Sequence, residues 1–359
     1  MSTLKVDNIR HNNATSDAIT MAADGTCTGN ITNKPNYNLL INGQFDVWQR
    51  STSSNSTTGS GYVSADRWRF EASGATYNTS QQVFAPGQTD VPSNPKYYLR
   101  FNVTTANDNT AVTQRIEDVD SVQGQHTLSF WAKGTNPAGG SIQVVFLQDF
   151  GSGGSSVVSG IIGNFSLSSS WAKQTFTFTP PSISGKTIGT SSYFNIRIRQ
   201  PSADDTTTAW NIDLANVKLE AGSKATDYQR VGFGDELARC QRYFFRMKAA
   251  SNYSAYGMGG AYSSTQAVAL MHFPVPMRKI PDFSYNGNLS QFYDKVGGGS
   301  SFSSIAITQV MGDTTTGIPH LELLVLGTFT AGNPFILSTY NNTSTHLNFD
   351  AELPDTYSP

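Results

Sequence analysis

The sequence predicts an all-β protein with a central jelly-roll β-sandwich, a second, C-terminal β-sandwich domain and a short extended N-terminal anchor segment. Its composition favours this class, because only 14% of the residues are charged, 11% are aromatic and 32 are glycines, as in β proteins with many turns. Apolar and polar residues alternate with a period of two in several segments, which is typical of half-buried strands. Clusters of Gly, Pro, Asn and Asp separate these segments and indicate turns.

The chain of 359 residues is long for one hydrophobic core, because domains commonly hold about 100 to 200 residues. We expect an N-terminal anchor or oligomerisation segment at residues 1–36, a jelly-roll domain at 37–231 and a C-terminal β head domain at 232–359. The net charge of -2 leaves no excess of positive charge for phosphates, so nucleic acid is not an expected partner. No run of about 20 apolar residues occurs, so we expect no membrane insertion.

The first 36 residues carry few apolar side chains, and Leu4, Val6 and Ile9 are isolated among polar neighbours. So sparse a pattern can bury its apolar atoms only against something else. We interpret the segment as an anchor that becomes ordered by winding with copies of itself or by docking on a partner, and a frayed tail is the alternative.

In the central domain, residues 38–70 predict an opening strand and a first corner, and residues 210–219 predict the closing strand. A slip in the alternation near Ala215 indicates a β-bulge in that closing strand. Further alternating segments predict strands at residues 97–103, 112–116, 127–133, 176–178 and 194–199. The run at 142–150 is apolar on both faces, as in a central strand that is covered on both sides.

The C-terminal domain begins with the one credible helix, at residues 232–246, where apolar residues lie near helical spacing. Strands are expected at residues 267–273, 321–326, 335–337 and 347–352. Pro274 and Pro276 cannot donate to a sheet ladder and therefore indicate an edge or a loop.

The sequence offers little for catalysis. The five histidines are scattered, with no carboxylate at metal-ligand spacing, and neither a nucleophile elbow nor a P-loop occurs. Glu117, Asp118 and Asp120 crowd one short segment, which favours a solvated turn over a glycosidase pair. We expect no enzymatic activity and no cofactor, and we interpret Cys240 as a small buried residue.

Carbohydrate binding has better support, because sugars are recognised by aromatic faces and by planar polar groups. Trp131 lies on the polar face of its strand, where an indole is otherwise hard to explain. If their strands share a sheet, a sugar platform would combine Trp131 with four residues that also point away from apolar faces: Tyr98, Arg100, Arg197 and Arg199. The alternative is that a loop or a neighbouring subunit covers Trp131. Three further tryptophans are expected in the core: Trp48, Trp68 and Trp210.

Residues 38–46 (NLLINGQFD) and 210–220 (WNIDLANVKLE) resemble the first and closing strands of jelly-roll carbohydrate-binding modules. The pattern of the whole chain resembles tail-fibre and receptor-binding proteins of marine tailed phages. The segments that carry this second resemblance are 1–9 (MSTLKVDNI), 39–48, 65–68 (ADRW), 219–222 (LEAG), 225–228 (ATDY), 236–244 (ELARCQRYF) and 349–353 (FDAEL).

The resemblance implies a non-enzymatic virion structural protein that is assembled in the host cytoplasm. It implies attachment to other virion tail proteins through the N-terminal segment with Leu4, Val6 and Ile9, a homotrimer, and binding of host-surface polysaccharide through the β domains. A capsid-decoration or tail-adaptor-associated protein and a polysaccharide-degrading tailspike enzyme remain alternatives.

The carbohydrate-binding modules further imply a structural Ca²⁺, because Asp46 and Asp213 match acidic positions that help to hold calcium there. Gln44 stands where an acidic residue is common, and this departure weakens the expectation of a metal.

Overall fold

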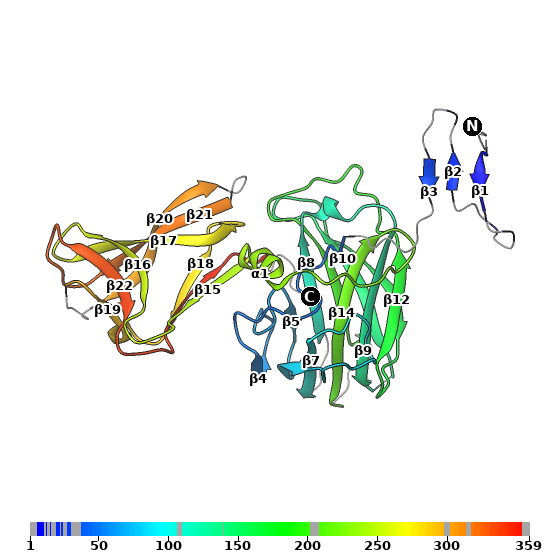
Figure 1. The fold of residues 1–359 in the computed structure, drawn as a ribbon, viewed down its shortest axis with the longest axis horizontal. Helices are drawn as coiled ribbons and strands as arrows, with labels where there is room; N and C mark the ends of the chain where they lie inside the picture. The colour runs from blue at the N-terminus through cyan, green and yellow to red at the C-terminus, as the bar shows by residue number, and fades with distance from the viewer. Residues whose placement is uncertain are drawn as a thin grey trace, which may run out of the picture.

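The computed structural model describes residues 6–10, 12, 15, 19–21, 23, 27–29, 37–105, 110–138, 140–201, 208–297, 302–313 and 317–353. Within these ranges the protein is all-β apart from one α-helix and short 3₁₀ turns, as the sequence predicts. A jelly-roll sandwich and a smaller C-terminal domain lie on either side of helix α1 (Phe233–Gln241) (Figure 1). In this part of the chain, no helix is long and apolar enough to cross a bilayer.

The N-terminal segment forms a small antiparallel sheet of β1 (Asn8–Ile9), β2 (Ile19–Met21) and β3 (Cys27–Gly29). Two of the predicted attachment residues, Val6 and Ile9, are 38% and 49% exposed. Leu4, the third, lies outside the described residues. Ile9, in β1, and Val6, just before it, therefore leave apolar surface exposed.

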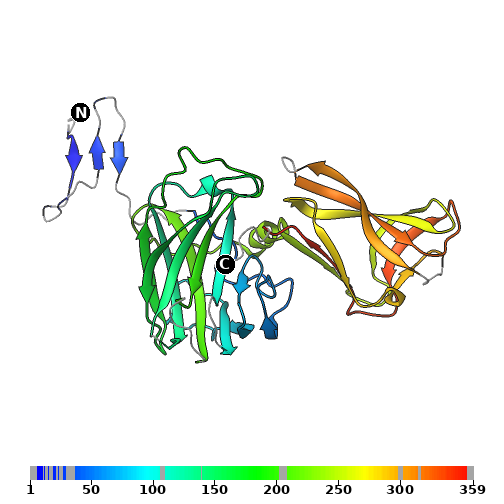
Figure 2. The ribbon, with the colours of Figure 1, turned by 180° about the vertical axis from the view of Figure 1, so that it is seen from behind.

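Two antiparallel sheets form the sandwich, which Figure 2 shows from behind. The first has five strands, in the order β11 (Val158–Phe165), β10 (Ile142–Asp149), β13 (Tyr193–Arg199), β8 (Ala111–Glu117) and β5 (Arg69–Glu71). The second has six, in the order β12 (Ala172–Phe178), β9 (His126–Thr135), β14 (Trp210–Ala221), β7 (Tyr97–Thr105), β6 (Thr76–Val83) and β4 (Ser53–Thr58).

Alternate residues of these strands face the opposite sheet and form one large core. Trp68 and Trp210 are each 1% exposed, and Trp48 packs against the core from its edge. The predicted positions of all three tryptophans are confirmed. The predicted bulge is also present, because the pairing of β14 with β9 shifts between Ala215 and Lys218.

The predicted opening strand is wrong for the residues before β4. The chain makes turns there, and Asn42 and Phe45 both have φ of 58°. The Asn42 side chain donates to the carbonyl oxygens of Val47 (2.8 Å) and Asp66 (3.0 Å), which holds the turn locally. Such side-chain bonds to the backbone compete with a strand ladder. The segment still lies against β14, since the Val217 amide donates to the Gly43 carbonyl at 2.9 Å.

The C-terminal domain packs a three-stranded sheet on a six-stranded one, as the predicted second sandwich. The smaller sheet has the order β15 (Phe244–Lys248), β23 (His346–Asp350) and β18 (Asp282–Asn286). The larger has the order β19 (Phe292–Asp294), β22 (Pro334–Thr339), β16 (Ala255–Ala261), β17 (Gln266–Met277), β21 (Gly317–Leu326) and β20 (Ser304–Asp313).

The two prolines of β17 interrupt its ladder without ending the strand. The pairing of β17 with β21 jumps from His272 to Met277, so neither Pro274 nor Pro276 is part of the regular register. The expectation of an edge or a loop is wrong, because β17 lies between β16 and β21 and continues through both prolines. The hydrogen-bond ladder is nevertheless interrupted there, because proline has no N–H to donate.

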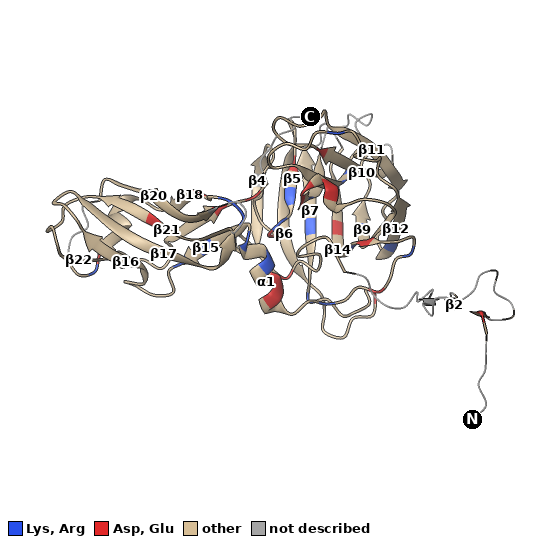
Figure 3. Ribbon diagram, turned by 90° about the horizontal axis from the view of Figure 1, so that it is seen from above, with Lys and Arg blue, Asp and Glu red and all other residues tan. Residues whose placement is uncertain are grey.

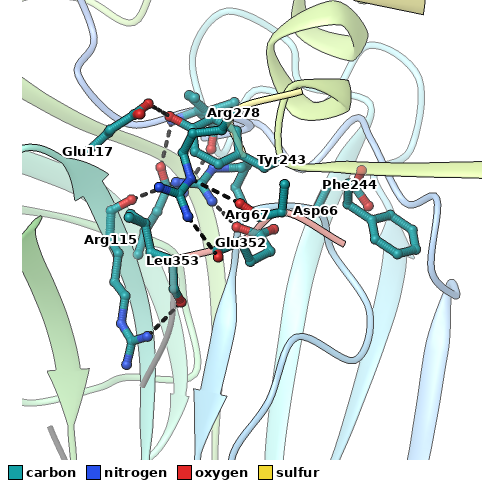
Figure 4. A network of polar contacts seen from close by, with 12 residues as sticks. Asp66, Arg67, Arg115, Glu117, Tyr243, Phe244, Arg278, Glu352 and Leu353 are labelled. Carbon is teal, nitrogen blue, oxygen red and sulfur yellow. Dashed lines mark hydrogen bonds and ion pairs between the residues drawn. The ribbon is translucent and has the colours of Figure 1, made fainter. Parts of the chain in front are cut away.

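The last described residues return from the C-terminal domain to the jelly roll (Figure 4). Glu352 is 5% exposed and pairs with Arg67 and Arg50. Arg115 donates to the Leu353 carbonyl at 2.9 Å, and Leu353 packs with Leu147 and Tyr193 of the five-stranded sheet. Glu352 and Leu353, which follow the last strand of the C-terminal domain, therefore form contacts between the two domains.

Candidate functional site

The predicted sugar platform is divided between two faces of the sandwich. Tyr98, Arg100 and Trp131 lie on β7 and β9, which flank β14 on the outer face of the six-stranded sheet. Arg197 and Arg199 lie on β13 of the other sheet, so the sandwich core separates them from Trp131. The condition for a single platform, that these strands share a sheet, is therefore not met. Alternation shows which residues share one face of a strand and not which sheet the strand joins.

The two arginines of β13 have protein partners. Arg197 is 5% exposed and forms an ion pair with Glu71, which also pairs with Arg69 at 2.9 Å. Arg199 donates to Gln143 Oε1 at 3.0 and 2.6 Å. The cavity beside Arg197 has a volume of only about 20 Å³, which is about the space of one water molecule.

The two predicted calcium ligands have different cationic partners. Asp213 is 1% exposed and accepts a bidentate bond from Arg100 at 2.7 and 2.8 Å. Asp46 lies 3.8 Å from Arg230, and burial raises the pKa of its carboxyl. Among the described residues, no group of three or more His, Cys, Asp and Glu side chains could hold a metal. The residues do not fit the calcium site that the resemblance implies, because Ca²⁺ takes six to eight oxygen ligands.

Charged residues lie along the strands of the jelly roll and are sparse on the strands of the C-terminal domain (Figure 3). On the outer face of the six-stranded sheet, Arg100 and Lys133 flank Asp213, with the Lys133 ammonium 3.9 Å from its carboxylate. These charged side chains lie beside an aromatic ring, since the Lys133 ammonium is 5.0 Å from the Trp171 ring centre.

Trp131 belongs to an aromatic cluster on this face. It packs with Phe84, Val91, Tyr98 and Trp171, and the Tyr98 and Trp171 rings meet edge to face with centres 5.2 Å apart. Residue 215, which is paired with Trp131 across the ladder, is an alanine and leaves room above the sheet for the indole. The loop that carries Phe84 and Val91 covers part of the cluster, and Trp131 itself remains half-buried.

Beside Trp131 lies a cavity of about 230 Å³. Its lining combines an indole with hydroxyl, amide, ammonium and carboxylate groups, from Pro92, Ser93, Ser129, Phe130, Trp131, Lys173, Asn216, Thr226, Asp227 and Tyr228. Trp131 and Lys173 are paired across β9 and β12 and therefore lie side by side in one wall.

The bulge in β14 shapes the second wall. Asn216, in the bulge, has φ of 50°. Its side-chain amide donates to the Pro92 carbonyl at 2.9 Å and to Ser93 Oγ at 3.1 Å, and its oxygen accepts from Gln44 at 3.2 Å. A regular strand would not present this side chain in the same direction, because a bulge changes where residues point.

A buried ion pair supports the third wall. Lys218 and Glu220 are 1% and 0% exposed and lie 3.1 Å apart. The Lys218 ammonium donates to Thr226 Oγ1 at 2.6 Å and to the Asp227 carbonyl at 3.2 Å, which fixes this segment of the cavity lining. Burial raises the pKa of the Tyr228 hydroxyl, and the Asn38 side chain hydrogen-bonds to it.

Sequence reasoning found Trp131 and missed the rest of the cavity. Asn216 lies within the predicted bulge, and that bulge was the one signal that could have identified it. Lys173 is an ordinary polar residue of an alternating strand. Thr226, Asp227 and Tyr228 belong to the ATDY segment that carries the phage resemblance, but that resemblance assigns them no contact with a ligand. These residues meet Trp131 only in the folded protein.

Comparisons with known proteins find no matching family model and no matching curated protein. Among solved structures, the CBM22-2 xylan-binding domain of Paenibacillus barcinonensis Xyn10C is 15% identical over 44% of this chain and 92% of its own, with a TM-score of 0.30. TmCBM61, solved with β-1,4-galactotriose, is 12% identical over 51% and 97%, with a TM-score of 0.27. The enzymatically active domain of bacteriophage CBA120 tailspike protein 4 is 16% identical over 51% and 21%, with a TM-score of 0.29.

Proposed function

We propose that this chain is a non-enzymatic, carbohydrate-binding virion protein that contacts a host-surface glycan at the Trp131 cavity. The observation that carries the proposal is that Trp131 and its cross-strand neighbour Lys173 line one cavity together with Asn216 and Asp227. An indole offers a flat face to the C–H surface of a sugar ring. The polar groups around it can exchange hydrogen bonds with sugar hydroxyls.

The size of the cavity suits one sugar unit of a polysaccharide. Its volume of about 230 Å³ is below the 300 to 1,000 Å³ that encloses a drug-sized ligand. We therefore expect the cavity to hold one sugar unit while the rest of the chain stays in solvent. Its walls are held by Asn216 and by the Lys218–Glu220 pair, so little ordering accompanies binding.

The lining favours binding over hydrolysis. Asp227 is the one carboxylate among the cavity residues that the structure describes, whereas most glycosidases place two carboxyl groups on either side of the scissile bond. The same lining argues against the alternative of a polysaccharide-degrading tailspike.

The virion role is supported by the resemblance of segments spread over the whole chain. The exposed Val6 and Ile9 provide apolar surface for attachment to other tail proteins. We propose a homotrimer that is fixed to the particle by its N-terminal segment and presents its β domains to host polysaccharide. The alternative is a decoration or adaptor-associated protein that binds only other virion proteins.

A glycan array probed with the full chain, followed by calorimetry on the best ligand, tests the binding site. Trp131→Ala should weaken binding at least tenfold, and Trp131→Phe should retain part of the affinity because a ring remains. Phe233→Ala is the matched control, since Phe233 is an aromatic residue, 58% exposed, at the start of α1 and is not part of the cavity lining. Unchanged affinity of Trp131→Ala, or release of reducing sugar from the ligand, would overturn the proposal.

The virion role needs a separate test. Antibodies against the C-terminal domain should label purified particles at a defined position. Ile9→Asp should reduce incorporation into particles and leave glycan affinity unchanged. Particles that lack the chain would show that the virion assignment is wrong, whatever the outcome for Trp131.

A further inference from the structure

We propose that the C-terminal domain holds a second, independent carbohydrate site that takes a neutral hexose unit. The site is a cavity of about 340 Å³ lined by Ala261, Asp294, Gly297, Thr328, Phe329, Thr330 and Asn333. These residues come from the end of β16, the end of β19 and the turn between β21 and β22. Strands β19 and β22 lie at the end of the C-terminal domain that is farther from the jelly roll (Figures 1 and 2).

A buried carboxylate with one free oxygen is the first observation. Asp294 is 6% exposed, and its Oδ1 accepts from the backbone amides of Val296 (3.1 Å) and Ile336 (3.4 Å). In the part of the chain that the structure describes, neither a hydrogen-bond donor nor a cation contacts Oδ2. Oδ2 is not among the fully buried atoms that lack a partner, so it is accessible and a ligand hydroxyl that enters this cavity can donate to it.

The backbone beside this oxygen is kept open by a glycine. A Cβ at residue 297 would lie 2.3 Å from Asp294 Oδ2. Any other residue in the same backbone position would therefore crowd the carboxylate. Gly297 leaves room for close approach of the backbone to Asp294 and keeps the free oxygen at the cavity wall.

The second observation is a supported aromatic wall. The Phe329 ring centre lies 5.5 Å from that of Phe335 at an interplanar angle of 81°, and 5.9 Å from that of Phe302. The Phe329 amide donates to the Ser264 carbonyl at 2.9 Å, which fixes the backbone as well. Phe329 is half-buried and lines the cavity, so part of its surface is left for the C–H face of a sugar.

The remaining polar groups of the cavity are the Asn333 amide and the hydroxyls of Thr328 and Thr330. The backbone of Asn333 is held by bonds to Thr330 (3.1 Å) and Ala261 (3.0 Å). No described residue hydrogen-bonds to its side chain, which is exposed at the cavity rim together with Thr328 and Thr330. A primary amide both donates and accepts. Adjacent sugar hydroxyls can therefore donate to Asp294 and exchange bonds with Asn333 at the same time.

The charge of the cavity selects the ligand class. Asp294 is the one ionisable group among the described residues that line the cavity, and the nearby Lys295 ammonium instead donates to the Tyr253 carbonyl at 3.3 Å. A uronate or phosphate would meet a buried carboxylate without a compensating cation, which is unfavourable. A neutral hexose uses the carboxylate as an acceptor and needs no counter-charge.

This inference extends the proposed function, because two sites on one chain would bind a repeating polysaccharide with higher avidity than either alone. It does not depend on the Trp131 cavity. Saturation-transfer NMR and titration of the full chain with glucose, galactose, mannose and N-acetylglucosamine, and with glucosamine as a cationic comparison, test it directly.

At least one of these neutral sugars should bind, and Asp294→Asn and Phe329→Ala should each weaken that binding at least tenfold. Asn333→Ala is the variant least able to disturb folding, because its side chain is exposed, and it should weaken binding about threefold to tenfold. The control is Asp282→Asn, an exposed carboxylate of the same domain, which should have no effect. Trp131→Ala should leave the binding in place.

Three results would overturn the inference. The first is that none of the four neutral sugars binds. The second is that Trp131→Ala abolishes all sugar binding while Asp294→Asn leaves it unchanged, and the third is that glucosamine binds more tightly than the neutral sugars. The second of these would leave the Trp131 site intact as a proposal. Conversely, Trp131→Ala could leave polysaccharide binding unchanged while Asp294→Asn abolishes it. That result would refute the Trp131 site and support the Asp294 site.

Discussion

Glu352, near the chain's end, and Arg67, in the jelly roll, form an ion pair in which the two residues are 5% and 1% exposed. Arg278 adds bonds to the Ala351 and Glu352 carbonyls at 3.0 and 3.1 Å, and Arg50 lies 3.5 Å from the same carboxylate. Figure 4 shows the residues converging from both domains. Glu352 is the ion-pair partner of both Arg67 and Arg50, so this carboxylate matters for the stability of the junction.

We expect Glu352→Ala to lower the free energy of unfolding by about 3 to 5 kcal/mol, because removing one partner leaves buried arginines uncompensated. Urea unfolding followed by fluorescence measures this. Asp282→Ala breaks the exposed Lys279–Asp282 pair (3.2 Å) and is the control, with an expected change below about 0.5 kcal/mol. Equal effects of the two substitutions would contradict the role of the junction.

Arg197 is expected to act in stability and not in sugar binding. It is buried against Glu71 on the face of the sandwich opposite to Trp131. Arg197→Ala should cost about 3 kcal/mol of unfolding free energy because the remaining carboxylate loses one of two cationic partners. Glycan affinity of the folded variant should match that of the parent protein. A tenfold loss of affinity with unchanged stability would reverse this assignment.

Two glycines should respond in opposite ways to alanine. A Cβ at Gly43 would lie 2.1 Å from the Val217 carbonyl oxygen, so Gly43→Ala should destabilise the protein by about 1 to 3 kcal/mol. At Gly234, in the first turn of α1, a Cβ would meet nothing within 4 Å. Gly234→Ala should be neutral or stabilise by about 0.5 kcal/mol. Thermal unfolding of both variants checks the contrast, and a stable Gly43→Ala protein would refute the close packing of residues 38–46 on β14.

Stability should fall as the pH drops below about 6.5, in part through His346. Burial and then the charge of Arg246 lower the pKa of His346 in the folded protein from 6.5, and Lys248, opposite on β15, adds to the effect. As the pH falls, the unfolded chain binds the proton first, so unfolding becomes more favourable between pH 6.5 and the lower folded pKa. Unfolding free energies at pH 5 to 7.5 should show a shallower loss for His346→Gln. An identical slope for both proteins would exclude this contribution.

Cys240 should be unreactive in the native protein. It is fully buried, and desolvation raises the pKa of its thiol well above 9.0, which leaves little of the nucleophilic thiolate. Iodoacetamide followed by peptide mass spectrometry should modify the Cys240 peptide in denaturant and not in buffer. Rapid native labelling of that peptide would mean that the α1 region opens.

The local pattern of residues was enough to predict the all-β class, the faces of most strands and the bulge near Ala215. Phe194, Ile196 and Ile198 face the core as their alternation requires, because a strand turns successive side chains to opposite faces whatever its neighbours are. The core tryptophans followed from the same rule. These features depend on residues that are adjacent in the sequence.

Only the tertiary structure decided which strands share a sheet, and therefore that Trp131 and Arg197 lie on opposite faces. It also decided that residues 38–46 form turns, that Glu352 returns to the jelly roll, and that Asp294 meets Phe329. Each of these depends on pairing between segments far apart in the chain. Such pairing is set by the packing of the whole core, and no local period of two encodes it.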